Sequence, residues 1–302
     1  TRDPCYCGIN SDCGDEMIVV DRLGNVQTNG EGQNNLLKKL YGTFLGRCAL
    51  KILVCKFVSD LGGWYMNSSL SKRRIAPFIK ENKIDMSQYE RREFKSYNDF
   101  FTRKIVDGKR PFLADDNVLI SPADSKLSCY KIDQDSRFMI KDTRYSLGEL
   151  LEDDELAKEY MNGYWMIFRL TVDDYHRYSF IDDGKIIGNK YIKGRFHTVN
   201  PIANDYYPIY KQNSRSYTII ESKNFGKMIQ MEVGAMMVGR IVNHDKKQCF
   251  KGEEKGYFEF GGSTVIILLK ENQVVIDNDI IENSMNDKET VVKLGETIGK
   301  KY

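Results

Sequence analysis

The sequence predicts an α+β fold in which a helical N-terminal region packs on a mainly antiparallel β core. From Leu36 onward, apolar residues recur every three or four positions, as they do in amphipathic helices. After Pro111 the chain consists of short β-rich runs separated by Gly, Asn and Asp. A chain of 302 residues can bury a sizeable core, as one large domain or as a core with a subdomain.

The helical prediction rests on an apolar stripe with cationic side chains off it. The stripe is formed by Leu37, Leu40, Tyr41, Phe44, Cys48, Ile52 and Cys55. Two further helical stretches are expected, at Ser71–Glu81 and Tyr97–Lys104. Residues 1–35 are polar and rich in glycine, with one short predicted strand at Met17–Val20. We therefore expect a tail of unknown role over 1–35 and a basic amphipathic helical region over 36–110.

The β-rich core is predicted over residues 111–302. Its expected strands are Arg137–Lys141, Trp165–Leu170, Tyr217–Glu221, Met228–Val233, Thr264–Leu269 and Val274–Asp277. The segment Tyr145–Tyr160 has the composition of a helical insertion between two of these strands.

The charge of the chain is unevenly distributed. The net charge is only +2, which predicts no general affinity for nucleic acid. Between Leu36 and Lys80, however, nine Lys and Arg residues stand against the single acid Asp60. Two interpretations of this basic region remain open: helices that pack on the β core with solvated lysines, or a helix at an anionic membrane surface.

Other features of the sequence narrow the class of protein. No run of about 18 uncharged apolar residues exists, and the N-terminus lacks the residue order of a secretory signal, so we expect neither a transmembrane helix nor secretion. Cys5, Cys7 and Cys13 lack a second Cys/His pair at zinc-site spacing, so no metal is expected. Seven scattered cysteines fit reduced thiols in the cytoplasm.

The Gly261-Gly262-Ser263-Thr264 element stands between two strand-like runs. By itself it reads as an ordinary hairpin turn. The same residues also permit chemistry, because a serine hydroxyl can attack the carbonyl of a preceding glycine that has no Cβ to crowd it. Elimination of the resulting ester leaves dehydroalanine, which hydrolyses to a pyruvoyl group, a carbonyl electrophile that can form a Schiff base with an amine.

Six elements in order give the chain a resemblance to the phosphatidylserine decarboxylase family. They are Tyr97–Arg103 (F-F-x-R block), Ser121–Asp124 (S-P-x-D), Asp173–Phe180 (D-Y-H-R), Val199–Ala203, Met231–Gly239 and Phe260–Thr264 (F-G-G-S-T). Any one of these elements is a weak signal, but together, ending in Phe-Gly-Gly-Ser-Thr, they are specific. The resemblance covers about residues 36–302.

The resemblance implies a self-cleaving proenzyme. Cleavage between Gly262 and Ser263 would give a β chain of residues 1–262 and an α chain of residues 263–302, with Ser263 converted into the pyruvoyl cofactor. The implied activity, that of a carboxy-lyase, is decarboxylation of phosphatidylserine to phosphatidylethanolamine and CO2 through a Schiff base. The resemblance also favours the membrane interpretation of the basic region, with the protein bound peripherally at the cytoplasmic face of the cell membrane.

The family's Asp–His–Ser arrangement implies catalytic roles for Asp124, His176 and Ser263. The family has a second histidine three residues after the first, and Ser179 occupies that position here. Serine has no pKa near neutrality and cannot replace an imidazole base. Only three histidines exist in the chain, so we expect His197, which directly precedes a family element, to supply the second imidazole.

Several alternatives stay open at this stage. His176 could serve both steps, His244 could contribute, or the chain could mature slowly or not at all. Ser125 stands where the family usually has glycine, and Arg177 is a candidate for binding a substrate carboxylate or phosphate. The alternative functions are a non-catalytic lipid-surface-binding homologue and a pyruvoyl decarboxylase of a soluble amino acid. The sequence leaves a homo-oligomer open.

Overall fold

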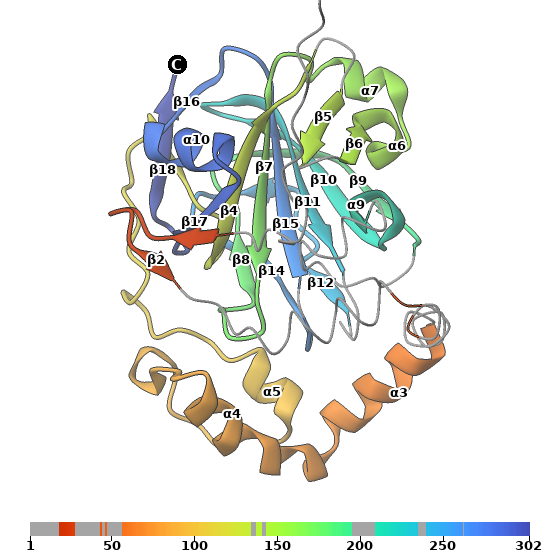
Figure 1. Ribbon diagram of the computed structural model, residues 1–302, viewed down its shortest axis with the longest axis vertical. Coiled ribbons are helices and arrows are strands. Elements are labelled where there is room, and N and C mark those ends of the chain that lie inside the picture. Colours follow the sequence, from red (N-terminus) through yellow and green to blue (C-terminus); the bar gives the residue numbers. More distant parts are fainter. Residues whose placement is uncertain are drawn as a thin grey trace, which may run out of the picture.

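The computed structural model of the chain describes residues 18–27, 43, 46, 56–133, 137–140, 143–194, 209–234, 240–261 and 263–302. A large sheet dominates this structure, with smaller sheets and helices around it (Figure 1). The α+β prediction is therefore confirmed. Most of the predicted helix over Leu36–Cys55 lies outside the described residues.

The large sheet has ten strands, and β15 lies near its middle. In spatial order they are β13 (Gln248–Cys249), β9 (Gly184–Ile192), β10 (Arg215–Ser222), β11 (Gly226–Val233), β15 (Ser263–Leu269), β7 (Tyr164–Leu170), β4 (Ser125–Lys131), β17 (Lys288–Val292), β1 (Ile18–Val20) and β2 (Val26–Gln27). Among the described strands, only β1 and β17 pair in parallel. The tail thus contributes β1 and β2 to the sheet, where Val19 and Val20 are buried.

Three smaller sheets complete the β structure. One contains β12 (Ile241–Asn243), β14 (Glu254–Phe258) and β8 (Arg177–Ser179). Another contains β16 (Val274–Ile276), β18 (Thr297–Lys301) and β3 (Val118–Ile120). In the third, β5 (Arg137–Ile140) pairs with β6 (Thr143–Ser146). The two three-stranded sheets pack on one face of the large sheet and close an apolar core, to which Phe168, Tyr178 and Phe258 belong. The strands predicted from residues 137, 165, 217, 228, 264 and 274 are all present.

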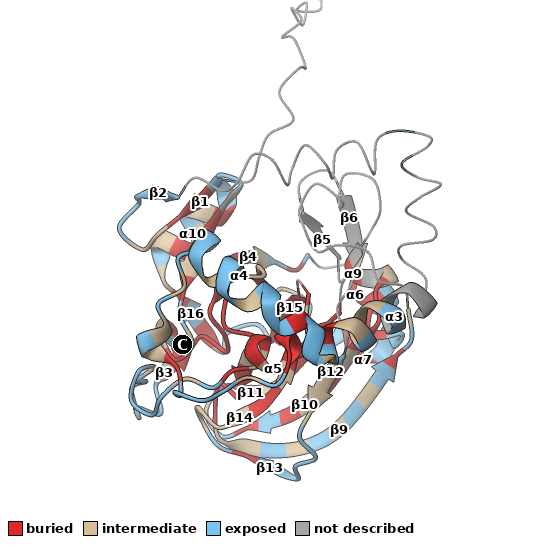
Figure 2. Cartoon of the chain, turned by 90° about the horizontal axis from the view of Figure 1, so that it is seen from below, coloured by how far each residue is buried: buried red, intermediate tan, exposed pale blue. Residues whose placement is uncertain are grey.

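The helices fall into two groups. Helices α6 (Leu147–Leu151), α7 (Asp154–Lys158) and α9 (Ile209–Gln212) cover the other face of the large sheet, around Trp165 and Ile266. Helices α3 (Lys56–Asn67), α4 (Ile75–Glu81) and α5 (Tyr97–Phe101), with the 3₁₀ helices η1 (Ser69–Arg74) and η2 (Met86–Gln88), lie along one end of the strands (Figures 1 and 2). Helix α10 (Asn278–Met285), which the sequence pattern did not predict, packs on β4 and β17.

Helix α5 forms where the sequence encodes both a cap and an apolar anchor. The Ser96 hydroxyl accepts a hydrogen bond from the Asp99 N–H (3.1 Å), which satisfies one of the free donors of the first turn. Phe100 and Phe101 are fully buried, and burial of a phenylalanine side chain contributes about 1.5–3 kcal/mol. This short helix is therefore fixed against the end of the β core, next to the segment that leads into β15.

Candidate active site

Ser263 is the first residue of β15, and its side chain is fully buried. It lies opposite Leu170 of β7, and side chains alternate along a strand, so Ser263, Val265 and Ile267 share the face that packs on the smaller sheets. Within the described part of the chain, the Ser263 Oγ has no hydrogen-bond partner. An unsatisfied buried hydroxyl costs about 1–3 kcal/mol, and this one is free to act as a nucleophile.

The segment before Ser263 is held by α5. The Phe260 ring packs against the rings of Tyr97 (5.1 Å between centroids) and Phe101 (5.3 Å). The Phe260 N–H donates to Oδ1 of Asn98 (2.9 Å). Gly261 follows with a φ of +135°, a conformation that side chains with a Cβ rarely adopt. Gly262 lies outside the described residues, so its predicted role as the scissile residue stays a prediction.

His176 precedes β8 and is completely buried. Its ring packs on Phe101 at 4.1 Å, and its backbone carbonyl accepts from the Phe258 N–H (2.9 Å). Because Phe101 contacts both His176 and Phe260, one side chain of α5 joins the histidine to the segment before Ser263. The predicted nucleophile and the first predicted histidine thus belong to one buried region.

The protonation state of His176 follows from its contacts. Nδ1 lies 3.0 Å from the backbone oxygen of Asp174, which can only accept, so Nδ1 carries the hydrogen. Nε2 then has a lone pair, and no described residue hydrogen-bonds to it. Burial lowers the pKa of His176 to about 3, because the loss of solvation, together with the positive charges of Arg103 and Lys126, outweighs the hydrogen bond to Asp174 and the charge of Asp173. His176 is therefore a neutral imidazole whose Nε2 lone pair has no partner among the described residues.

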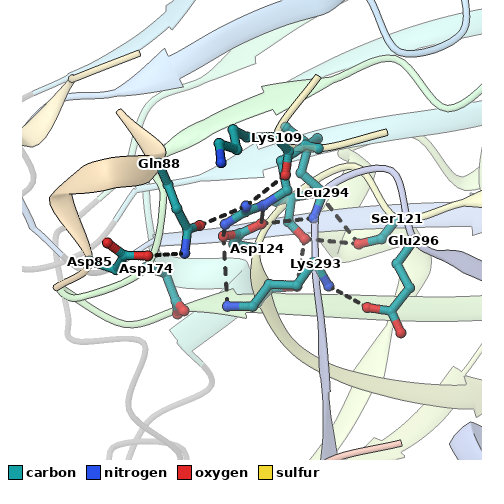
Figure 3. Close-up of polar contacts among 12 residues, drawn as sticks. Asp85, Gln88, Lys109, Ser121, Asp124, Asp174, Lys293, Leu294 and Glu296 are labelled. Atoms are coloured by element: carbon teal, nitrogen blue, oxygen red, sulfur yellow. Dashed lines mark hydrogen bonds and ion pairs between the residues drawn. The ribbon is translucent and has the colours of Figure 1, made fainter. Parts of the chain in front are cut away.

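Asp124 is buried at the start of β4 and is bound by cations (Figure 3). The Arg110 guanidinium donates to both of its oxygens (2.9 and 2.6 Å), and the Leu294 N–H donates to Oδ1 (2.8 Å). Burial alone would raise the pKa of Asp124, but the hydrogen bonds from Arg110 and the charges of Lys293 and Arg110 outweigh it and lower the pKa. Among the described contacts of Asp124 there is none to a histidine, so its catalytic role stays a prediction.

Asp174, two residues before His176, contacts the histidine through its backbone and not through its carboxylate. The Asp174 carboxylate accepts from Lys126 Nζ (2.6 Å) and from the Thr171 N–H (2.7 Å). Orientation of the His176 ring comes from the backbone oxygen of Asp174, which no side-chain pattern in the sequence reveals.

Ser179, where the family has its second histidine, is also buried, and its Oγ has no partner among the described residues. Its N–H donates to the Pro122 carbonyl (2.9 Å), which ties β8 to the segment that carries Asp124. Its carbonyl accepts from Nε2 of Gln230 (3.0 Å). Position 179 therefore lies beside the Asp124 segment, although a hydroxyl there cannot act as a base.

The other candidates lie elsewhere. Arg177 donates to the Thr102 carbonyl (2.9 and 2.8 Å) and to Glu254 (2.8 and 3.0 Å), so a role in substrate binding, still a prediction, would require these contacts to break. His244 is exposed and pairs with Glu254 at 2.8 Å, away from the buried region. His197 lies outside the described residues, and its expected role stays a prediction.

Comparison with known proteins decides the family. The family model described as phosphatidylserine decarboxylase matches residues 97–300. A relative from Clostridium acetobutylicum, named phosphatidylserine decarboxylase proenzyme 2, is 52% identical over 89% of this chain and 92% of its own. Relatives named phosphatidylserine decarboxylase proenzyme are 46% identical in Clostridium botulinum (86% and 91% covered) and 41% identical in Fusobacterium nucleatum (94% and 97% covered).

The chain belongs to the phosphatidylserine decarboxylase family. The resemblance inferred from six short elements is thus confirmed. In this member of the family, the roles of Ser263, His176 and Asp124 stay predictions. The sequence did not indicate that Phe101 contacts His176 or that Arg110 binds Asp124. Phe101 lies inside the F-F-x-R block, which indicated the family but not what this side chain contacts. Arg110 gave no signal, because its contact with Asp124 depends on the tertiary fold.

Two properties of the decarboxylase family member concern metals and membranes. Over the described residues, no group of three or more His, Cys, Asp or Glu side chains is arranged to hold a metal ion. No described helix has both the length and the apolar character needed to cross a bilayer.

Proposed function

We propose that this protein is a self-processing carboxy-lyase that converts phosphatidylserine into phosphatidylethanolamine and CO2 with a pyruvoyl cofactor made from Ser263. The observation that carries the proposal is the buried hydroxyl of Ser263, which no described residue hydrogen-bonds, in the same buried region as a neutral His176. The names of the relatives, all proenzymes of this activity, support the substrate and the need for processing.

In the proposed self-cleavage, Ser263 Oγ attacks the Gly262 carbonyl carbon while its proton passes to Nε2 of His176. The amide is exchanged for an ester. Loss of the α-proton of residue 263 then expels the Gly262 carboxylate as the new C-terminus of residues 1–262. The dehydroalanine left behind takes up one water and releases one ammonia, which leaves a pyruvoyl group on residue 263. The described residues fit this chemistry, because none of them hydrogen-bonds the Ser263 hydroxyl and His176 is unprotonated.

The pyruvoyl group supplies a carbonyl that bonds to the substrate amine and accepts the electrons left by CO2. The chain supplies the surroundings of that carbonyl. Ser263 is fully buried, and the neutral His176 can accept or return a proton there. His197 remains our candidate for a second imidazole.

The architecture supports a stable cleaved form. Residues 263–302 contribute β15, β16, β17, β18 and α10. Strand β15 pairs with β11 on one side and with β7 on the other, both from residues 1–262. A cut before β15 therefore leaves the α chain inserted in the β chain through two ladders of hydrogen bonds.

The activity is tested with vesicles that contain phosphatidylserine labelled at the carboxyl carbon. We expect the mature protein to release labelled CO2 and the Ser263→Ala protein to release none. Turnover of free serine but not of vesicles would favour a decarboxylase of a soluble amino acid. If the chain remains uncut and inactive while it binds vesicles, the non-catalytic alternative is favoured.

The base is tested with precursor variants run on denaturing gels. We expect His176→Asn, which keeps a donor for the Asp174 carbonyl, to slow cleavage strongly. The exposed His244→Asn is the matched control and should cleave like the wild type. Complete cleavage of His176→Asn with failure of His197→Ala would transfer the role to His197.

We also propose that the protein binds peripherally to the cytoplasmic face of the cell membrane through α3 and η1. Three large apolar side chains there are exposed: Leu61 (55%), Trp64 (71%) and Leu70 (65%). Lys72, Arg73 and Arg74 follow directly and are exposed as well. Apolar side chains beside cations are the combination that binds an anionic bilayer surface.

The membrane proposal has a direct optical test. The chain has two tryptophans, of which Trp64 is exposed and Trp165 is buried. We expect anionic vesicles to shift the emission of the wild type to shorter wavelength and to leave Trp64→Phe, whose only tryptophan is Trp165, unshifted. An unshifted wild type, or a shift that neutral vesicles produce equally well, would contradict an anionic docking surface at α3.

A further inference from the structure

Arg103 is a buried cation that pairs with none of the described acids. Its side chain is 1% exposed and lies between the rings of Tyr89 (4.3 Å) and Phe100 (4.8 Å). Its hydrogen bonds are long, at 3.3 Å to the Tyr89 hydroxyl and 3.4 Å to the Phe100 carbonyl. Nε has no partner, and no carboxylate of the described residues lies within ion-pair distance of the guanidinium. Several donors are therefore weakly used or unused.

Three other buried cations of this protein pair with a buried carboxylate, whereas buried Arg215 donates to backbone carbonyls and lies 4.0 Å from the exposed Glu152. Lys126 pairs with Asp174 (2.6 Å), Lys255 pairs with Glu232 (2.8 Å), and Arg169 pairs with Glu289, all buried. Burial of a charge costs several kcal/mol unless it is paired and hydrogen-bonded. The two aromatic faces compensate Arg103 only in part, since a cation–π contact contributes about 0.5–2 kcal/mol. The described residues thus leave Arg103 without the anion that would complete its pairing.

Arg103 lies beside the candidate active site. It is two residues from Phe101, which contacts both His176 and Phe260. Tyr89, which covers the guanidinium, lies 6.1 Å from the ring of Tyr175, the neighbour of His176. The positive charge of Arg103 also lowers the pKa of His176. An anion bound by Arg103 would therefore lie close to the reacting groups.

We infer that Arg103 binds the phosphodiester of the substrate headgroup through the donors that the fold leaves free. This inference rests on the proposed phosphatidylserine substrate. The headgroup offers two anions, and the phosphodiester is the better partner for two reasons. It keeps its charge throughout the reaction, and a fork of guanidinium donors matches two phosphate oxygens. An arginine on the carboxylate would instead stabilise the ground state that must lose CO2.

The experiment measures binding to the uncut Ser263→Ala precursor by calorimetry, so that the result does not depend on activity. The probes are glycerophosphoethanolamine, which has the phosphodiester without a carboxylate, and L-serine, which has the carboxylate without a phosphate. We expect the phosphodiester to bind and Arg103→Lys to weaken it roughly tenfold or more, because lysine keeps the charge but loses the fork. Serine binding should not change. Arg91→Lys, at an exposed arginine, is the matched control.

Each other outcome overturns the inference. Weaker serine binding with unchanged phosphodiester binding would assign Arg103 to the carboxylate. Unchanged binding with a lower unfolding temperature would make Arg103 a structural residue of the aromatic cluster. No phosphodiester binding by a folded precursor would also refute it. In the mature enzyme, Arg103→Lys should raise the KM for vesicles roughly tenfold with little effect on kcat, a split that a structural role does not produce.

Discussion

The neutral state of buried His176 has a measurable consequence for stability. The pKa of His176 falls from an ordinary 6.5 to about 3 because the ring is completely buried. Below pH 6.5 the unfolded chain therefore binds a proton at this residue and the folded chain does not. A histidine whose folded pKa is lowered makes the protein less stable as the pH falls through the unfolded value.

The size of the effect can be worked out at pH 5. Each pH unit below the unfolded pKa costs about 1.36 kcal/mol while the folded group stays neutral. With the unfolded value at 6.5 and the folded value near 3, His176 destabilises the fold by about 2 kcal/mol at pH 5 relative to neutral pH. This figure depends little on the folded pKa, because that pKa lies well below 5.

The assay is urea unfolding of uncut precursors at pH 7.5 and pH 5. The Ser263→Ala protein is compared with the Ser263→Ala/His176→Asn protein, so that all other titrating groups are shared. We expect the loss of stability between the two pH values to be about 2 kcal/mol smaller in the double variant. An equal loss in both proteins would refute the neutral, buried imidazole and with it the proposed base.

Three further predictions concern the surroundings of the site. Glu232→Gln should lower the free energy of unfolding by about 3–5 kcal/mol in urea unfolding, because buried Lys255 loses its carboxylate. The control Lys158→Gln, in an exposed pair with Glu155, should cause no measurable change. Gly261→Ala should cost about 1–3 kcal/mol and slow cleavage on denaturing gels, since φ is +135° at this residue. Unimpaired cleavage and stability would contradict the need for glycine at this position. The cleaved chains should co-elute in native size exclusion and separate only in denaturant, because β15 pairs with β11 and β7. Separation without denaturant would contradict this pairing of β15 between β11 and β7.

Local patterns predicted much of the fold. Strands β7, β10, β11 and β15 are formed by apolar runs rich in β-branched and aromatic residues. This composition, typical of buried strands, made them predictable from the sequence. Helix α10 was missed because its residues Asn278–Met285 contain few apolar positions. Its Ile280 and Ser284 are buried by tertiary packing, which no local pattern encodes.

The candidate site was predictable only in part, for a different reason. Ser263 and His176 could be found because the chemistry requires their residue types in a recognisable element. The pairing of Arg110 with Asp124 and the contact of Phe101 with His176 join segments distant in sequence. The unpaired charge of Arg103 is a property of its surroundings, since only a folded structure shows that none of the described acids pairs with it.

The central claim, that Ser263 becomes the cofactor, is tested most directly by the intact mass of the purified protein. We predict two chains, residues 1–262 and residues 263–302, with the smaller chain lighter than its encoded sequence by one ammonia. The Ser263→Ala protein should show only the uncut mass. A wild-type chain that stays whole, or a small chain that retains the full mass of an N-terminal serine, would contradict the claim.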